Sequence, residues 1–293
     1  MTGSSPAEVL REHLAAGRQL VVPGAANALA ARIIEDLGFD AVYVTGAGIA
    51  NTFLGSPDIG LVGLGELRDH VEAIADAVAT PLIVDADTGF GSPLNVARTV
   101  RVLERAGAAA IQLEDQVSPK KCGHFAGKAV IPVGDMVAKV RAARDACASD
   151  ATLIVARTDA RVVEGMDQAL CRAHAYREAG ADILFVEAPQ SLSELRRVVR
   201  EVPAPHVANM VEGGLTPLLP ASELPEFSVV LFANVALQAA VKGMQSVLAD
   251  VRRTGSLAAV ADRIAPWAER QRLVRKDIFD VLDETYRSET GAP

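Results

Sequence analysis

Aromatic residues and cysteines are scarce in this sequence. Aromatics make up 4% of the 293 residues, with a single tryptophan, and there are three cysteines, Cys122, Cys147 and Cys171. An odd number of cysteines in a chain of this length argues against a disulfide framework. Cys147 and Cys171 fall within helical patterns, so we expect both to be small core residues.

Long apolar runs and an excess of positive charge are also missing. The longest apolar candidate, 228–241, is interrupted by Asn234 and Gln238, and a membrane helix needs roughly 20 apolar residues. Residues 1–12 contain no basic segment followed by an apolar run, so we expect no signal peptide and a cytoplasmic location. The formal net charge of -8 offers no broad positive surface, so we expect neither nucleic acid nor membrane as a partner.

The sequence is rich in small apolar residues arranged in short runs. Half of the residues are apolar, and continuously apolar runs are typical of parallel strands that are buried on both faces. We expect strands at 19–22, 41–45, 82–86, 108–113, 152–156, 182–186, 205–208 and 228–232. We expect helices at 26–37, 65–79, 92–106, 134–148, 165–179, 191–201 and 234–252.

Eight βα units in this length favour a closed (β/α)8 TIM barrel of the α/β class. A doubly wound open sheet, in which the strand order reverses, is the alternative. Gly38, Gly107 and Gly180 follow expected helices, as C-terminal caps do. We predict a catalytic barrel over residues 1–255 and a C-terminal helical extension over 256–293.

Polar residues follow the expected strands at a constant position. They are Thr45 after strand two, where Gly46 and Ala47 follow, Asp85 and Asp87 after strand three, and Glu114, Arg157, Glu187 and Asn209 after the next four strands. Active sites of TIM barrels lie at the carboxyl ends of the strands. We therefore expect these residues to share one site.

Asp85, Asp87 and Glu114 carry hard oxygen ligands on adjacent strands. Mg²⁺ prefers such ligands, often through water, and keeps positions open for a substrate. Alternate residues of a strand point to the same side, so Asp85 and Asp87 should face one ion. Helix capping is the competing interpretation for Asp87. We predict a Mg²⁺ site, with Mn²⁺ as a substitute.

Arg157 and the Thr45-Gly46-Ala47 segment are candidates for binding an anion. The planar guanidinium of Arg157 suits a carboxylate, although a pairing with Glu187 or Asp159 would equally account for it. The small residues after strand two let backbone N–H groups approach an anion. Glycine after a strand is also common for conformational reasons alone.

A long loop follows Glu114 and reads EDQVSPKKCGHFAGKAVIP. About seventeen residues separate Glu114 from the next helix, which is long for a βα connection and typical of a lid. Lysines beside Cys122 would lower the pKa of its thiol, and a thiolate can act as base or nucleophile. An exposed basic loop with an incidental cysteine is the alternative. One cysteine beside one histidine, His124, is too little for a zinc site.

Five segments together closely resemble the isocitrate lyase/phosphoenolpyruvate mutase superfamily. They are DADTGFG (85–91), EDQVSPKKCGH (114–124), ARTDA (156–160), FVEAP (185–189) and NMVEGG (209–214). The likeness runs in order from about residue 18 to 255. The short length without insertions is most similar to the methylisocitrate lyase, dimethylmalate lyase and carboxyphosphonoenolpyruvate mutase branches.

The resemblance implies roles for individual residues. It implies a magnesium site formed by Asp85, Asp87 and Glu114. It implies substrate contacts from Thr45, Gly46, Ala47, Asp58, Gly123, Arg157, Glu187, Asn209 and Thr216. It implies catalytic roles for Cys122, Lys121, His124, Arg157 and Glu114, with Cys122 as an acid/base on a mobile gating loop.

The resemblance also implies an activity and an assembly. The activity is Mg²⁺-dependent carbon–carbon cleavage of a 2-hydroxy-dicarboxylate, which gives a 2-oxo-acid and a carboxylate through an enolate-like intermediate. The assembly is a homotetramer of helix-swapped dimers, with 256–286 as the exchanged element.

The segment after strand eight departs from the family pattern. Phe232-Ala233-Asn234-Val235 stands where many lyases have Tyr-Pro-Leu-Ser, and Gln238 stands near the position of a following arginine. Without that cation, a substituted malate is favoured over methylisocitrate. The alternatives are a phosphonomutase of the carboxyphosphonoenolpyruvate or phosphoenolpyruvate type, an oxaloacetate hydrolase or decarboxylase, and a non-enzymatic barrel that binds a 2-oxo-acid. The complete set of acidic residues, Arg157 and Cys122 argues against the last of these.

Overall fold

The computed structural model describes residues 3–120 and 127–290. The chain divides into two compact units, Met1–Val235 and Ala236–Pro293. The division falls at the start of helix α10 (Val235–Thr254), whereas the sequence prediction grouped that helix with the barrel. The predicted domains 1–255 and 256–293 stay a prediction.

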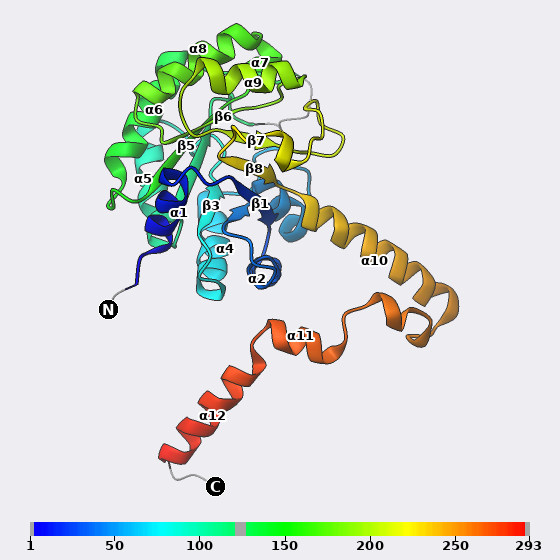
Figure 1. The fold of residues 1–293 in the computed structure, drawn as a ribbon. Coiled ribbons are helices and arrows are strands. Elements are labelled where there is room, and N and C mark those ends of the chain that lie inside the picture. Colours follow the sequence, from blue (N-terminus) through cyan, green and yellow to red (C-terminus); the bar gives the residue numbers. More distant parts are fainter. Residues whose placement is uncertain (1–2, 121–126, 291–293) are drawn as a thin grey trace. The chain divides into compact units, whose positions relative to one another are not determined.

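The first unit is built around eight parallel strands (Figure 1). They are β1 (Leu20–Ala25), β2 (Val42–Val44), β3 (Leu82–Asp85), β4 (Ala110–Glu114), β5 (Leu153–Thr158), β6 (Ile183–Val186), β7 (Val207–Asn209) and β8 (Val229–Phe232). Their order is β6-β5-β4-β3-β2-β1-β8-β7, and a parallel bridge between Leu184 and His206 joins the two remaining edges. The predicted TIM barrel is confirmed, and the open doubly wound sheet is excluded.

Helices surround the strands of this unit (Figure 1). The principal ones are α2 (Ala28–Asp36), α4 (Leu64–Ala77), α5 (Pro93–Arg105), α6 (Val133–Ala146), α8 (Met166–Glu178) and α9 (Leu192–Glu201). Short elements absent from the sequence prediction are α1 (Pro6–Ala15), α3 (Gly46–Ile49), the π-helix η1 (Ala50–Leu54), α7 (Ala160–Val163) and the 3₁₀ turn η2 (Ala221–Glu223).

Helix α5 illustrates why these segments are helical. Ser92 precedes Pro93, and the Asn95 side chain accepts a hydrogen bond from the Ser92 N–H at 3.0 Å, which satisfies a donor at the helix start. Val96, Val100 and Leu103 recur at helical spacing and are fully buried. Burying one such side chain contributes ~1.5–3 kcal/mol.

The predictions for the capping glycines and for the two cysteines in helical patterns have different outcomes. Gly38, Gly107 and Gly180 all have positive φ, at 79°, 106° and 108°, as expected of C-terminal caps. Cys147 is half-buried, and burial raises the pKa of its thiol to about 11. The prediction that Cys171 is a core residue is wrong: it is exposed, because its neighbour Leu170 takes the inward face of α8.

The second unit consists of helices α10, η3 (Ala258–Arg263), α11 (Trp267–Leu273) and α12 (Lys276–Thr290). The guanidinium of Arg263 contacts both Asp250 and Ser246 on α10, which holds η3 against that helix. The helical tail predicted over 256–286 is thus divided into η3, α11 and the longer α12, which extends to Thr290. Within the described residues, no helix is long and apolar enough to cross a membrane.

Candidate active site

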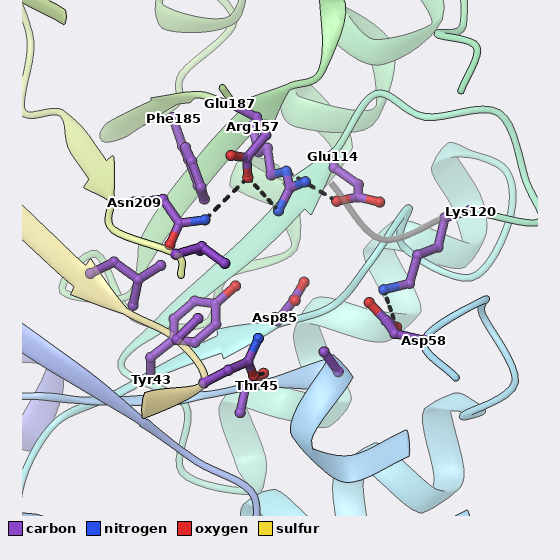
Figure 2. Close-up of a pocket in the computed structure, with 15 residues that line it drawn as sticks. Tyr43, Thr45, Asp58, Asp85, Glu114, Lys120, Arg157, Phe185, Glu187 and Asn209 are labelled. Carbon is purple, nitrogen blue, oxygen red and sulfur yellow. Dashed lines mark hydrogen bonds and ion pairs between the residues drawn. The ribbon is translucent and has the colours of Figure 1, made fainter. Parts of the chain in front are cut away.

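The carboxyl ends of the barrel strands surround one pocket (Figure 2). It is lined by Tyr43, Thr45, Ala47, Asp58, Asp85, Glu114, Lys120, Arg157, Phe185, Glu187, Asn209, Val211, Leu231, Ala233 and Asn234. The side chains predicted at the ends of six strands therefore do meet at one place, as expected for this fold. Their individual roles stay predictions.

Arg157 stands at the centre of a buried charge cluster (Figure 2). Its guanidinium lies 2.9 Å from Asp159, 3.3 Å from Glu114 and 3.2 Å from Glu187. The ring of Phe185 lies 5.1 Å from the guanidinium carbon. Burial alone would lower the pKa of Arg157, but the three carboxylates outweigh it and raise the pKa above its usual value. Arg157 is therefore a permanent cation, and it does pair with both acids considered from the sequence.

Glu114 contributes a carboxylate oxygen with unused hydrogen-bonding capacity. Its Oε2 faces Arg157, while its Oε1 is buried without a hydrogen-bond partner among the described residues. Burial raises the pKa of Glu114 well above its usual value despite Arg157. A buried carboxylate with raised pKa is a better proton acceptor than an exposed one.

Asp85 and Asp87 converge, but not for the predicted reason. Strand β3 ends at Asp85, and Asp87 has a φ of 48° in a turn, so the argument from strand alternation is wrong. A Cβ placed on Gly46 would lie 3.5 Å from Asp85 Oδ2 and 3.4 Å from Asp87 Oδ1. Both carboxylates therefore meet beside Gly46. Helix capping does not account for Asp87, because α5 begins only at Pro93.

Lys120 places a buried ammonium group between site carboxylates (Figure 2). Its Nζ lies 2.5 Å from Asp58 Oδ1 and 2.8 Å from Asp87 Oδ1. Burial would lower the pKa of Lys120, but the surrounding acids, Asp87 first, raise it above its usual value. Burial raises the pKa of Asp87 to about 7 even beside this lysine. In the sequence, Lys120 stands out only as a neighbour of Cys122, because its spacing gives no sign that the chain brings it back to the strand ends.

The acidic residues were tested as a metal site. No group of three or more His, Cys, Asp or Glu side chains in the described parts of the chain is arranged to hold an ion by itself. The side chains of Asp85, Asp87 and Glu114 offer only oxygen atoms, and Lys120 shows that a cation is stable among them. Oxygen donors at this looser spacing fit a hydrated Mg²⁺, which usually retains several waters in proteins.

Thr45 links the strand-two segment to the end of β8. Its Oγ1 accepts a hydrogen bond from the Gly48 N–H at 3.1 Å, which caps α3, and donates to Asn234 Oδ1 at 3.1 Å. Ala47 lines the pocket beside it. From the sequence, Asn234 had no predicted role in the site.

The other predicted residues differ in their placement. Asn209 lines the pocket and donates to Glu187 Oε2 at 3.3 Å. Thr216 is buried but is not among the residues that line the pocket. The predicted loop residues Lys121, Cys122, Gly123 and His124 lie outside the described residues.

Both described flanks of that loop are bound to the site. Lys120 precedes it and contacts Asp58, and Lys128 follows it with its Nζ 2.6 Å from Asp159 Oδ1. Asp159 is in turn bound to Arg157. Two lysines within the predicted gating loop thus contact carboxylates of the site cluster, and Lys128 had no role in the sequence prediction.

A TIM barrel with an acidic pocket and a central buried arginine describes a class of enzymes that act on small anions. Residues 10–252 match the family of phosphoenolpyruvate phosphomutase, and the chain belongs to that family. It is 42% identical to 2,3-dimethylmalate lyase of Eubacterium barkeri, over 94% of this chain and 96% of that protein. It is 48% identical to 2-methylisocitrate lyase of Aeropyrum pernix, over 88% of this chain and 84% of that protein.

Solved structures give the same assignment. A crystal structure of 2,3-dimethylmalate lyase matches with a TM-score of 0.90 and 34% identity, over 97% of this chain and 96% of that chain. Oxaloacetate acetylhydrolase with 3,3-difluorooxalacetate matches with a TM-score of 0.90 and 32% identity, over 99% and 98%. Phosphonopyruvate hydrolase with oxalate and Mg²⁺ matches with a TM-score of 0.88 and 28% identity, over 97% and 99%. The predicted superfamily and lyase-type enzyme class are confirmed.

Proposed function

We propose that this protein is a Mg²⁺-dependent lyase that cleaves a substituted malate into a 2-oxo-acid and a carboxylate. Relatives named 2,3-dimethylmalate lyase and 2-methylisocitrate lyase support the reaction class. The observation that carries the proposal is one pocket whose lining combines the charged Glu114 and Arg157 with the apolar Phe185, Leu231 and Ala233. Such a pocket suits an anion that carries alkyl substituents.

The charge of the pocket supports a malate over a tricarboxylate. The cationic side chains among its described lining residues are Lys120 and Arg157, and each already contacts at least two carboxylates. Each further carboxylate on the substrate would meet Asp58, Asp85 and Glu187 at close range. Like charges in a buried site cost more than they do in water.

Magnesium is the cofactor that we propose, held by Asp85, Asp87 and Glu114 with water completing its coordination. When bound, the ion would supply positive charge that stabilises the developing oxyanion of the 2-oxo-acid. The relative crystallised with oxalate and Mg²⁺ supports this assignment.

The chain's own residues supply binding and proton transfer. Arg157 orients a substrate carboxylate, and the Thr45–Ala47 segment contacts the 2-oxo-acid end. Glu114 accepts the proton of the substrate hydroxyl at its Oε1, which is buried without a hydrogen-bond partner among the described residues. The bond between the hydroxyl carbon and its neighbour then breaks, and the electron pair leaves on the departing carboxylate fragment. Cys122, which lies outside the described residues, protonates that fragment, a role that the family resemblance implies.

The decisive experiment measures pyruvate and propionate released from 2,3-dimethylmalate, with Mg²⁺ and with excess EDTA. We expect stoichiometric products with Mg²⁺ and none with EDTA. Methylisocitrate, oxaloacetate and phosphonopyruvate serve as competing substrates in the same assay. Cleavage that persists in EDTA would contradict the metal role, and turnover of oxaloacetate or phosphonopyruvate alone would contradict the lyase assignment.

Cys122→Ser tests the proton donor. We expect a loss of turnover of about 10²–10⁴-fold, the usual contribution of general acid catalysis. Cys147→Ser is the matched control, because Cys147 follows the end of α6 and is not among the residues that line the pocket. Equal losses in both variants would contradict the role of Cys122.

The assembly that we propose is a homo-oligomer, a tetramer of two helix-swapped dimers. The second unit supports it, because its described side chains include exposed Trp267, Phe279 and Tyr286. Exposed aromatic side chains in such number are typical of a surface that is covered by another chain.

A further inference from the structure

Asn234, at the end of β8, contributes an amide whose orientation is fixed. Its Oδ1 accepts the hydrogen bond from Thr45 Oγ1 at 3.1 Å. A side-chain amide has one acceptor oxygen and one donor nitrogen with two N–H groups. Because the oxygen faces Thr45, the Nδ2 group is directed away from Thr45, and Asn234 lines the pocket.

The hydrogen bonds of Thr45 leave it no proton for a ligand. A threonine hydroxyl carries one hydrogen. That hydrogen goes to Asn234, and the oxygen accepts from the Gly48 N–H at 3.1 Å. At this end of the pocket, the side-chain donor is therefore Asn234 and not Thr45.

The other side-chain donors that line the pocket already contact carboxylates. Lys120 contacts Asp58 and Asp87; Arg157 contacts Asp159, Glu114 and Glu187; Asn209 donates to Glu187; Tyr43 is hydrogen-bonded to Asp85. Among the described lining residues, the Nδ2 group of Asn234 is the side-chain donor for which no partner is found. This donor is therefore available to an oxygen acceptor of a ligand.

We propose that Asn234 is a specificity-determining residue, whose Nδ2 group donates a hydrogen bond to an oxygen of the 2-oxo-acid half of the ligand. This inference deepens the proposed function and rests on it. The amide is neutral, so it adds no positive charge to the pocket. Because its N–H groups donate only to an acceptor, we expect the ligand to place an oxygen at the Thr45 end of the pocket. An aspartate at the same position would keep the acceptor for Thr45 but place a negative charge against that oxygen.

The test compares Asn234→Asp and Asn234→Ala with the wild-type protein. Calorimetry measures the binding of oxalate in the presence of Mg²⁺, since oxalate presents two adjacent carboxylates and lacks the departing half of the substrate. We expect affinity to fall ~3- to 10-fold in Asn234→Ala, as for the loss of one ordinary hydrogen bond, and at least ~10-fold in Asn234→Asp, which also adds a negative charge. Asn95→Asp is the matched control, because it makes the same change at an exposed helix start, and we expect it to bind oxalate like the wild type.

The outcomes separate this inference from the proposed function. Wild-type protein that binds no oxalate with Mg²⁺ overturns the proposed function and this inference with it. Wild-type protein that binds oxalate while both Asn234 variants bind it equally well overturns only the role of Asn234. Thermal melting checks the fold of each variant. Should Asn234→Asp fail to fold, Asn234→Ala and Asn234→Ser decide the question, and unchanged oxalate affinity in these two is then the contradicting result.

Discussion

At the scale of single residues, Lys120 is the unexpected feature of the site. Its ammonium group lies within 2.8 Å of the carboxylates of both Asp58 and Asp87, while Asp85 and Glu114 also stabilise its charge. A divalent ion that approaches these oxygens meets a positive charge already in place. Because like charges repel strongly where water is scarce, Lys120 and the proposed Mg²⁺ compete for the same carboxylates.

Lys120→Met should therefore raise the affinity for Mg²⁺ in the absence of substrate. We expect an increase of about tenfold, which corresponds to ~1.4 kcal/mol. Titration calorimetry with Mg²⁺ or Mn²⁺ measures it directly and does not depend on turnover. Lys242→Met, at an exposed position of α10, controls for the change in net charge. Weaker metal binding by Lys120→Met would mean that the lysine helps to build the metal site.

At the scale of elements, the sequence predicts the barrel more fully than the site. Each strand is a short apolar run buried on both faces, so its position follows from composition alone. Asp87 and Lys120 depend instead on turns that bring the chain back after a strand has ended. Such turns lack the periodic pattern of apolar residues by which strands and helices are predicted from a sequence. The sequence does not predict that Asn234 belongs to the site, because its hydrogen-bond partner Thr45 is 189 residues away in the sequence.

The junction of β6 and β7 makes the stability of the barrel sensitive to acid. His206 lies there fully buried, with one ring nitrogen 2.7 Å from the Val202 carbonyl oxygen. Burial lowers the pKa of His206 below its ordinary value of 6.5. As pH falls below 6.5, the unfolded chain gains a proton that the folded barrel resists, so the free energy of unfolding decreases until the folded pKa is reached.

His206→Gln should reduce this acid sensitivity, since glutamine keeps a donor for the Val202 carbonyl but has no proton to gain. Between pH 6.5 and the folded pKa, one such group contributes at most about 1.4 kcal/mol per pH unit to the slope. Urea denaturation at pH 7.0, 6.0 and 5.0 measures the free energy of unfolding. Parallel pH profiles for the variant and the wild type would show that other groups govern acid unfolding.

At the scale of the whole molecule, the second unit differs from the barrel in how little it buries. Val260 is its one buried hydrophobic residue among those described, while Leu248, Trp267, Phe279 and Tyr286 are each more than 60% exposed. The apolar residues of α12 recur at helical spacing and form an amphipathic helix. A helix of this kind is stabilised by packing rather than by its own propensity.

Phe279→Asp should therefore weaken self-association. Each chain has a mass of 30.7 kDa, and we expect the wild type to elute at a multiple of it, measured by light scattering after size exclusion. The variant should shift towards smaller species as it is diluted, because an unpaired charge buried in an apolar interface strongly disfavours association. Asp280→Asn, at an exposed neighbouring position of the same helix, should keep the wild-type mass.

Since the pocket-lining residues all precede Val235, oxalate binding by the dissociated variant then distinguishes a site that is complete within one chain from a site that needs the partner. A wild-type mass of one chain would remove the case for assembly altogether.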